Sequence, residues 1–333
     1  MTEAWPLSPW VAEHRDRVGF SLHVFPIDTK EEPVRRMLDA GRLAEELGFD
    51  AFIFSDHPAW GPECWVHMAA LAATTERIRL GTGVVCALYR HPVMTARLAA
   101  DLDNLSNGRL ILGLGCGWDA GEFANLGLPF PPVPERQAAL EEAIAIIRGV
   151  WGDAPFSFAG RYFQTTDTRV APPPRQRPGP PVVIAGGGEK VTLRQVAQYA
   201  DACQLGTFGM IGGEATTAGI RQKLAVLRQH CETLGRPFES VLRTHFTGWL
   251  ILAEDEALLA AKLKRLAPEG LDQRFSGRWD GFALATTVEQ AITYYHELVA
   301  AGIQYFDIEL LDASDVETIR LFAEQVIPEV RSA

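Results

Sequence analysis

The fold is decided by Ile78–Trp118, which reads IRLGTGVVCALYRHPVMTARLAADLDNLSNGRLILGLGCGW, because this stretch contains one complete strand–helix–strand unit. Ile78–Val85 and Arg109–Leu114 are short apolar runs containing glycine, as expected for strands that are buried on both faces. Between them, apolar residues recur at helical spacing from Pro92 until Gly108 ends the helix. Strands joined in this way are parallel neighbours, so their carboxyl ends lie at the same edge of a sheet.

Both strands bring small residues to this shared edge. They are Gly83, Val84 and Cys86 at the end of the first strand, and Gly115, Cys116 and Gly117 after the second, with Trp118 next in the chain. Glycines at such positions let the backbone approach a flat ligand closely, so this edge is predicted to bind one. The two cysteines are interpreted as small core residues rather than nucleophiles, because no motif ties a histidine to them. Trp118 is either a stacking platform or a packed aromatic residue.

The strand–helix unit repeats along the whole chain. The eight predicted strands are Val18–Phe25, Asp50–Ser55, Ile78–Val85, Arg109–Leu114, Pro181–Ala185, Ala202–Leu205, Leu242–Leu252 and Ile303–Leu310. Amphipathic helical patterns alternate with them and no break in composition divides the chain, which predicts one domain, 1–333, with the (β/α)8 TIM-barrel fold. Extra segments are expected at 119–133, 152–181 and 267–286; the second includes a hairpin over Phe156–Phe163 and a proline-rich strap over Ala171–Pro181.

The composition narrows the class of protein further. Hydrophobic residues make up 47% and charged residues 22%, which is a globular balance, and the net charge of −11 argues against nucleic-acid or anionic-membrane partners. The five cysteines are widely spaced without a CxxC pair, as in a reducing compartment and without structural zinc. No signal-peptide pattern is present, and no apolar run approaches the roughly 20 residues of a membrane span, so a cytoplasmic location is expected.

Asp56-His57, directly after the second predicted strand, is the best candidate for acid–base chemistry. Function in this fold lies at the carboxyl ends of the strands, and histidine titrates near neutral pH beside a carboxylate that favours its charged form. The structural alternative is a loop histidine packed under Trp60, with Asp56 capping the turn. Both interpretations remain open at this point. Metal binding is the weaker reading, because no HxH motif or second carboxylate cluster accompanies the pair.

Ala185 ends the fifth predicted strand, and Gly186, Gly187 and Gly188 then open a helix that runs through Tyr199. Bare backbone N–H groups at the positive end of a helix form a generic phosphate site. The alternative is only a tight connection between a strand and a helix. The segment has neither the Walker spacing nor the dinucleotide fingerprint.

Six motifs, taken in order, resemble the bacterial luciferase-like flavin- and deazaflavin-dependent oxidoreductase family. They are SDH (Ser55–His57), LGTGV (Leu80–Val84), YRHP (Tyr89–Pro92), LSNGRLILGLGCGW (Leu105–Trp118), ER (Glu135-Arg136) and GGGEKVTLRQVAQYADACQ (Gly186–Gln204). Each motif alone is weak, whereas the ordered set covers nearly the whole chain.

The resemblance implies a TIM barrel that binds either FMN or the deazaflavin coenzyme F420. The Gly186–Gln204 segment, followed by KLAVLRQHCETLGR (Lys223–Arg236), looks most like the F420-dependent branch, and Asp56-His57 falls where that branch has its active-site pair. The same resemblance implies a cis peptide at Gly83–Val84, with a bulge behind the cofactor ring, and a homodimer.

In this reading His57 is the acid/base, Asp56 orients it, and Lys190 or Arg90 offers a positive charge to the acidic coenzyme. A coenzyme phosphate approaches the three glycines after Ala185. The substrate pocket is expected at His23, Trp60 and Phe208, and Phe25 and Trp118 add to its apolar mouth.

The expected substrate is a small, uncharged organic molecule. Cys116-Gly117-Trp118 stands where the branch's sugar-phosphate dehydrogenase has an acidic residue after the glycine, which argues against a sugar phosphate. Two alternatives remain. One is an FMN-dependent monooxygenase that uses O₂ and reduced flavin from a separate reductase; the other is a flavin-binding barrel without activity, which the acid–base pair disfavours.

Overall fold

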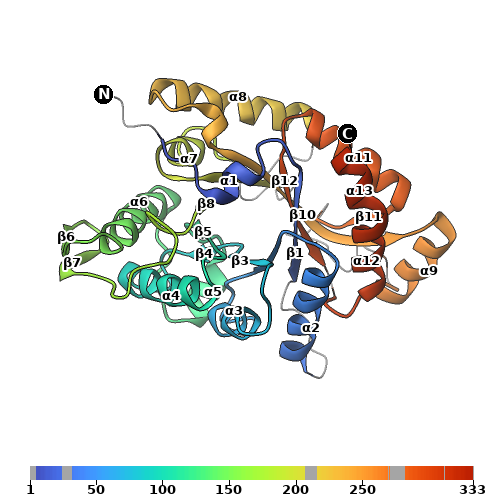
Figure 1. Ribbon diagram of the computed structural model, residues 1–333, viewed down its shortest axis with the longest axis horizontal. Coiled ribbons are helices and arrows are strands. Elements are labelled where there is room, and N and C mark those ends of the chain that lie inside the picture. The colour runs from blue at the N-terminus through green and yellow to red at the C-terminus, as the bar shows by residue number, and fades with distance from the viewer. Residues whose placement is uncertain are drawn as a thin grey trace.

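The computed structural model describes residues 5–24, 32–206, 216–268, 270, 282–310 and 312–332. Eight parallel strand positions form a closed barrel, with helices on the outside (Figure 1). In spatial order the strands are β1 (Gly19–Val24), β2 (Ala51–Phe54), β3 (Arg79–Thr82) continued by β4 (Val85–Cys86), β5 (Leu110–Gly115), β8 (Val182–Ala185), β9 (Ala202–Gly206), β10 (Leu242–Ala253) and β12 (Tyr305–Leu310). The ring closes because β12 pairs with β1, so the TIM-barrel prediction is confirmed.

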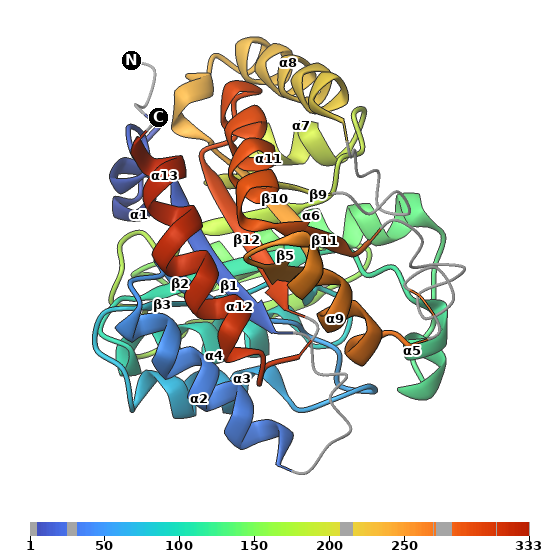
Figure 2. The same cartoon turned by 90° about the vertical axis from the view of Figure 1, so that its right-hand side faces the viewer.

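Helices cover the barrel between these strands. They are α2 (Pro33–Glu46), α3 (Cys64–Ala72), α4 (Pro92–Leu105), α6 (Val133–Val150), α7 (Thr192–Tyr199), α8 (Thr217–Thr233), α9 (Glu256–Leu266), α11 (Val288–Ala300) and α12 (Val316–Leu321), which continues through a π-helical turn (Phe322–Val326) into α13 (Ile327–Ser332). Figure 2 shows α12 and α13 lying in front of the strands, beside α2 and α11. None of the described helices is long and apolar enough to cross a membrane.

Local sequence explains where α4 and α11 begin. Pro92 occupies the first turn of α4, and the preceding His91 accepts a hydrogen bond from the N–H of Val93, which caps the helix. Thr287 and Gln290 form a reciprocal capping box at the start of α11. These caps fix the helix starts that the sequence pattern indicated.

The extra segments contain more regular structure than predicted. Helix α5 (Ala120–Asn125) lies in the segment expected to be irregular, and β11 (Leu284–Thr287) pairs with β10 within the expected 267–286 insertion. The predicted hairpin exists as β6 (Phe156–Ala159) and β7 (Gln164–Thr168), so its second strand begins after Phe163 rather than before it. Short helix α1 (Pro9–Glu13) was not predicted.

The proline-rich strap after β7 lies against α4. Arg97 donates to the carbonyl of Ala171, Asn104 donates to that of Pro173, and Asp103 accepts from the backbone and side chain of Gln176. The strap returns the chain to β8, as the sequence analysis expected.

The two ends of the barrel differ. At the amino-terminal ends of the strands, α1 places Trp10 and Val11 in a small apolar cluster with Tyr305 and Ile111, so this end is filled. At the carboxyl-terminal ends a cavity remains, and most of the residues singled out in the sequence lie there.

Candidate active site

The cavity has a volume of about 410 Å³. The predicted site residues that line it are His23, Asp56, His57, Gly83, Val84, Cys86, Gly115, Cys116, Gly117, Trp118, Ala185, Gly186 and Gly188. Trp60 and Gly187 are not among its lining residues, although Trp60 stacks on His57 and Gly187 adjoins Gly188. Phe25 and Phe208 lie outside the described residues. The fold therefore gathers segments that are far apart in the chain, while the roles assigned to the residues stay predictions.

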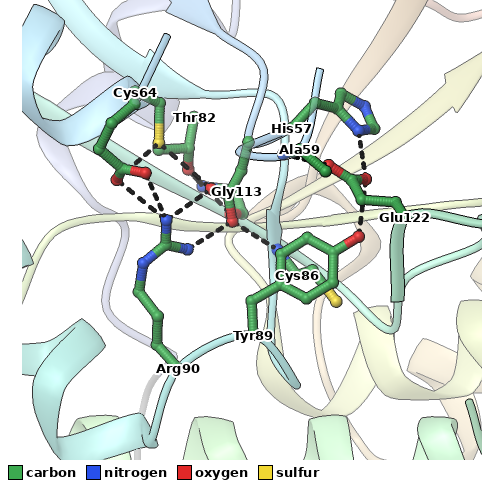
Figure 3. Close-up of polar contacts among 11 residues, drawn as sticks. His57, Ala59, Cys64, Thr82, Cys86, Tyr89, Arg90, Gly113 and Glu122 are labelled. Atoms are coloured by element: carbon green, nitrogen blue, oxygen red, sulfur yellow. Dashed lines mark hydrogen bonds and ion pairs between the residues drawn. The ribbon is translucent and has the colours of Figure 1, made fainter. Parts of the chain in front are cut away.

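His57 is held in place by a carboxylate and an aromatic ring. Its Nδ1 lies 2.7 Å from Oε2 of Glu122, and its ring stacks on Trp60 at a centroid separation of 4.3 Å. The Tyr89 hydroxyl donates to the same Glu122 oxygen at 2.7 Å, and the N–H of Ala59 donates to the other (Figure 3). An imidazole fixed in this way can exchange a proton in a defined orientation.

Asp56 does not orient His57, contrary to the sequence-based expectation. Arg90 donates to both oxygens of the buried Asp56 carboxylate, at 2.7 and 2.9 Å, and the N–H of Cys86 donates to one of them (Figure 3). A guanidinium satisfies both oxygens of a carboxylate at once, which an imidazole cannot do. Arg90 also bonds Glu63, so it is engaged within the protein rather than available to an acidic coenzyme tail.

Asp56, Glu63 and Cys64 also form a potential metal-ligand group, since their ligand atoms lie within 4.8 Å of one another. The Arg90 guanidinium bonds both carboxylates and supplies the positive charge that a metal ion would bring. Burial raises the pKa of the Cys64 thiol well above its usual value, which keeps the sulfur protonated. This cluster is therefore a structural ion-pair group.

The strand carrying Gly83 and Val84 is interrupted as the family resemblance implied. The Gly83–Val84 peptide is cis. Gly81 pairs with Ile111 and Val85 with Leu114, so four steps on one strand match three on the other, which is a bulge. Both parts of this prediction are confirmed.

Glycines keep this wall of the cavity flat. A Cβ at Gly83 would lie 2.5 Å from Ile53 and 3.0 Å from His23, and a Cβ at Gly115 would lie 2.8 Å from Val84. Real side chains do not fit at such distances, so the backbone itself forms the surface. A flat heterocycle fits against a wall of this kind.

The glycine segment after β8 leads into α7 later than predicted. The helix starts at Thr192, because Gly186 has a φ of +117° and a turn intervenes. The N–H of Gly186 bonds the carbonyl of Gln204, whereas the next two amides have no partner in the described part of the chain. Lys190 is exposed beside this turn. The turn retains amide groups that can bind a phosphate.

The floor of the cavity is polar and buried. The His23 Nδ1 lies 3.2 Å from Asp307, and its Nε2 lies 2.7 Å from the Ser55 hydroxyl. Asp307 also accepts from Gln204 at 3.0 Å. Burial lowers the pKa of His23, but the charge of Asp307 and its hydrogen bond outweigh this effect, so the net shift is upward.

Glu309 completes this floor and is 1% exposed. Burial raises its pKa to about 8; the positive charge of His23 opposes this shift and the charge of Asp307 adds to it. A carboxyl group with this pKa is mostly protonated at neutral pH.

Several residues that line the cavity or bond its lining residues were missed in the sequence. Ser55 and Tyr89 stand inside motifs that were quoted, but no role was attached to them. Glu122 was missed because it lies on α5, in a segment taken as irregular. Asp307 and Glu309 had a readable signal: two acidic residues with alternate spacing on a strand buried on both faces.

The chain belongs to the luciferase-like monooxygenase family, whose family model matches residues 18–314. It is 27% identical to a protein named F420-dependent glucose-6-phosphate dehydrogenase from Microbacterium testaceum (strain StLB037), covering 89% of this chain and 93% of that relative. It is 31% identical, over 56% of this chain and 52% of the relative, to a 4-hydroxyprotoasukamycin monooxygenase from Streptomyces nodosus subsp. asukaensis. The coenzyme F420-dependent tetrahydromethanopterin reductase of Methanopyrus kandleri shares the fold, with a TM-score of 0.76, 20% identity, and coverage of 94% of this chain and 99% of that one.

Proposed function

We propose that this protein is a coenzyme F420-dependent oxidoreductase that transfers a hydride between the deazaflavin and a small, uncharged organic substrate, with His57 as the acid/base. The observation that carries the proposal is the His57–Glu122 pair in a cavity whose neighbouring wall is the glycine-lined bulge at Gly83–Val84. The full-length similarity to an F420-dependent relative supports the choice of coenzyme.

The coenzyme supplies hydride chemistry when it is bound, because its ring carries carbon where a flavin has N5. The chain supplies orientation and a proton site. The wall at Gly83, Val84 and Gly115 would hold the ring, and Gly187 and Gly188 would take a phosphate. Because Glu122 holds Nδ1 of His57, the exchanged proton belongs on Nε2.

The cavity surface supports an uncharged substrate. Trp118, Phe246 and Phe282 give it aromatic walls. Of the described lining residues, Arg136 is the single arginine or lysine; it bonds the carbonyls of Gly117 and Pro131 and lies 4.1 Å from the Phe130 ring centroid. A sugar phosphate would therefore find no uncommitted cation on this described surface, although such a substrate appears in the relatives' names.

Binding of each cofactor tests the proposal. We expect tryptophan fluorescence, recorded while coenzyme F420 or FMN is added to the apoprotein, to show tighter binding of coenzyme F420. Catalysis is then tested with secondary alcohols and with glucose 6-phosphate as alternative hydride donors. Preference for FMN, with O₂ consumed when reduced flavin is supplied, would establish the monooxygenase reading that the Streptomyces relative favours.

We further propose that the protein is a homodimer formed through α3 and α4. Val66 on α3 is 65% exposed, and Met94 and Leu105 on α4 are more than half exposed, which leaves apolar side chains in water. Light scattering at micromolar concentration is expected to give twice the mass of 36.6 kDa. A monomer mass would contradict this.

A further inference from the structure

Glu309 is a buried carboxyl group to which no hydrogen bond is donated by the residues that the structure describes. It lies on β12 opposite His23 of β1, and it lines the cavity. Its Oε2 has no hydrogen-bond partner in the described part of the chain, and its Oε1 lies 3.8 Å from Nε2 of His23, beyond hydrogen-bond distance. A buried polar atom left unpaired costs free energy, so such an atom on a cavity wall points to a bound partner.

The neighbouring carboxylate, Asp307, differs from Glu309 because it accepts several hydrogen bonds from the protein. Asp307, two residues earlier on the same strand, accepts from Ser21 at 2.9 Å, from Gln204 at 3.0 Å and has His23 at 3.2 Å. Three donors stabilise its charge, whereas none of the described residues donates to Glu309. Of the two carboxyl groups, Glu309 is therefore the one that holds a proton, and a protonated carboxyl can donate a hydrogen bond.

The position of Glu309 favours the coenzyme over the substrate as its partner. A Cβ on Gly83 would lie 3.0 Å from the His23 ring, so His23 packs directly against the bulge wall, and Glu309 lies beside His23. His57, by contrast, is grouped with Trp60 and Trp118. The group nearest to Glu309 in a bound complex is thus the heterocycle placed on the bulge.

We propose that the Glu309 carboxyl group donates a hydrogen bond to the carbonyl-bearing edge of the coenzyme heterocycle, with the Asp307–His23–Ser55 chain positioning the floor around it. This inference rests on the proposed function. Deazaflavins and flavins both carry this acceptor edge, so the shared chemistry is that of a cyclic imide carbonyl. An ionised Glu309 would repel the same carbonyl oxygens.

The titratable groups that face Glu309 leave a pH range in which the ionisation of Glu309 can be tested. His23 faces it from β1 and Asp307 from β12. On β10, His245 pairs with Phe306, which lies on the opposite face of β12 from Glu309, so His245 does not face this carboxyl group. His57 also lines the cavity and is retained in all variants, so each result is expressed relative to Glu309→Gln.

The test measures dissociation constants of coenzyme F420 by calorimetry between pH 6.5 and 9.5, a readout that needs no turnover. Glu309→Gln keeps a donor and cannot ionise, whereas Glu309→Met removes the donor at similar length. Ser21→Ala is the matched control, because it removes a hydroxyl from the same buried network outside the cavity lining. Melting temperatures of the apoproteins verify that all variants fold.

At pH 7 we expect Glu309→Met to bind about tenfold more weakly than wild type, and Glu309→Gln to bind within about threefold. Relative to Glu309→Gln, wild type should weaken about tenfold from pH 7 to pH 9, because donation is lost as the carboxyl ionises. Ser21→Ala should follow wild type.

Equal binding by Glu309→Met and wild type, or a wild-type to Glu309→Gln ratio that does not change with pH, would overturn the inference while leaving the proposed function intact. If wild type prefers FMN, the assignment of coenzyme F420 fails, and the dissociation constants of wild type and the Glu309 variants are then compared for FMN. Absence of binding to either cofactor would overturn both proposals.

Discussion

Two buried carboxyl groups at opposite ends of the barrel have pKa values that are shifted in opposite directions. Asp50 precedes β2 at the amino-terminal end, and Glu309 lies near the carboxyl end of β12. Burial alone raises the pKa of both. Asp50 ends with a pKa of about 2 and Glu309 with a pKa of about 8.

The difference comes from donors. Asp50 accepts a hydrogen bond from the N–H of Phe20 at 2.8 Å and contacts Arg331 and Arg17, each at 2.7 Å; together with His14, whose Nε2 lies 3.7 Å away, these groups outweigh burial. At the cavity end no such donors surround Glu309 in the described part of the chain. A carboxylate saturated by the protein stabilises the fold, whereas one left without donors is available to a ligand.

The largest effect is expected from His57→Ala, which removes the proton site and leaves both carboxyl groups in place. Turnover should fall by roughly 10²–10⁴, the usual contribution of a positioned acid or base. Coenzyme affinity should stay within several-fold, because the glycine wall is unchanged. Steady-state kinetics and fluorescence titration measure the two quantities. If the variant loses coenzyme binding and keeps its turnover rate, His57 only lines the pocket and is not the acid/base.

Arg90→Met should convert Asp56 from a donor-rich carboxylate like Asp50 into a donor-poor one like Glu309. The Asp56 side chain is fully buried and the Arg90 side chain is 18% exposed. Breaking such a pair leaves a buried charge, so the unfolding free energy should fall by about 3 kcal/mol in urea denaturation.

The control for this variant is Arg320→Met, which breaks the exposed Arg320–Glu324 pair. An exposed pair contributes little, so the change should stay within about 0.5 kcal/mol. Similar losses for both variants would show that Asp56 tolerates the loss of its partner.

The sequence predicted the barrel and most of its strands because periodicity and glycine placement are local signals. It also placed His57 and the Gly83–Val84 bulge in the site, the latter through family resemblance. It could not identify the partners of Asp56 and His57, since Arg90 lies 34 residues from Asp56 and Glu122 lies 65 residues from His57, and only tertiary packing brings them together. Because Asp56 and His57 are adjacent in the sequence, they were predicted to interact, and the structure does not form this pair.

Asp50→Asn should destabilise the protein without affecting the cavity. The pKa of Asp50 is lowered from 3.8 to about 2, which corresponds to about 2 kcal/mol of stability. Because the folded-state pKa is the lower one, this stability is present above pH 4 and is lost as the pH falls toward 2. Urea denaturation at pH 7 and below pH 3 should show that the difference between wild type and variant narrows in acid.

Exposed Asp16 on the same end provides the control. Asp16→Asn should leave stability unchanged, and both variants should keep turnover within twofold of wild type. A large loss of turnover in Asp50→Asn would contradict the functional separation of the two barrel ends.

Glu122→Gln is expected to give the smallest effect. Glu122 shares features with both carboxyl groups compared above, since it has donors like Asp50 and lies at the cavity end of the barrel like Glu309. Glu122 is buried beside the lining residues His57 and Tyr89, and it has three donors: these two side chains and the N–H of Ala59. Glutamine keeps an oxygen for His57 and Tyr89, gives up the 3.3 Å hydrogen bond from Ala59, and removes the negative charge beside the imidazole. Turnover should therefore fall about tenfold, which is the difference between a charged and a neutral hydrogen bond to His57. Coenzyme affinity and melting temperature should not change, since the packing is conserved.

Tyr89→Phe removes another hydrogen bond from the same Glu122 oxygen. It should lower turnover less than about threefold, because the imidazole of His57 keeps its charged partner. If both variants lose stability together and turnover per folded molecule is unchanged, Glu122 belongs with Asp50 as a structural carboxylate, and the orientation of His57 must come from its stacking on Trp60.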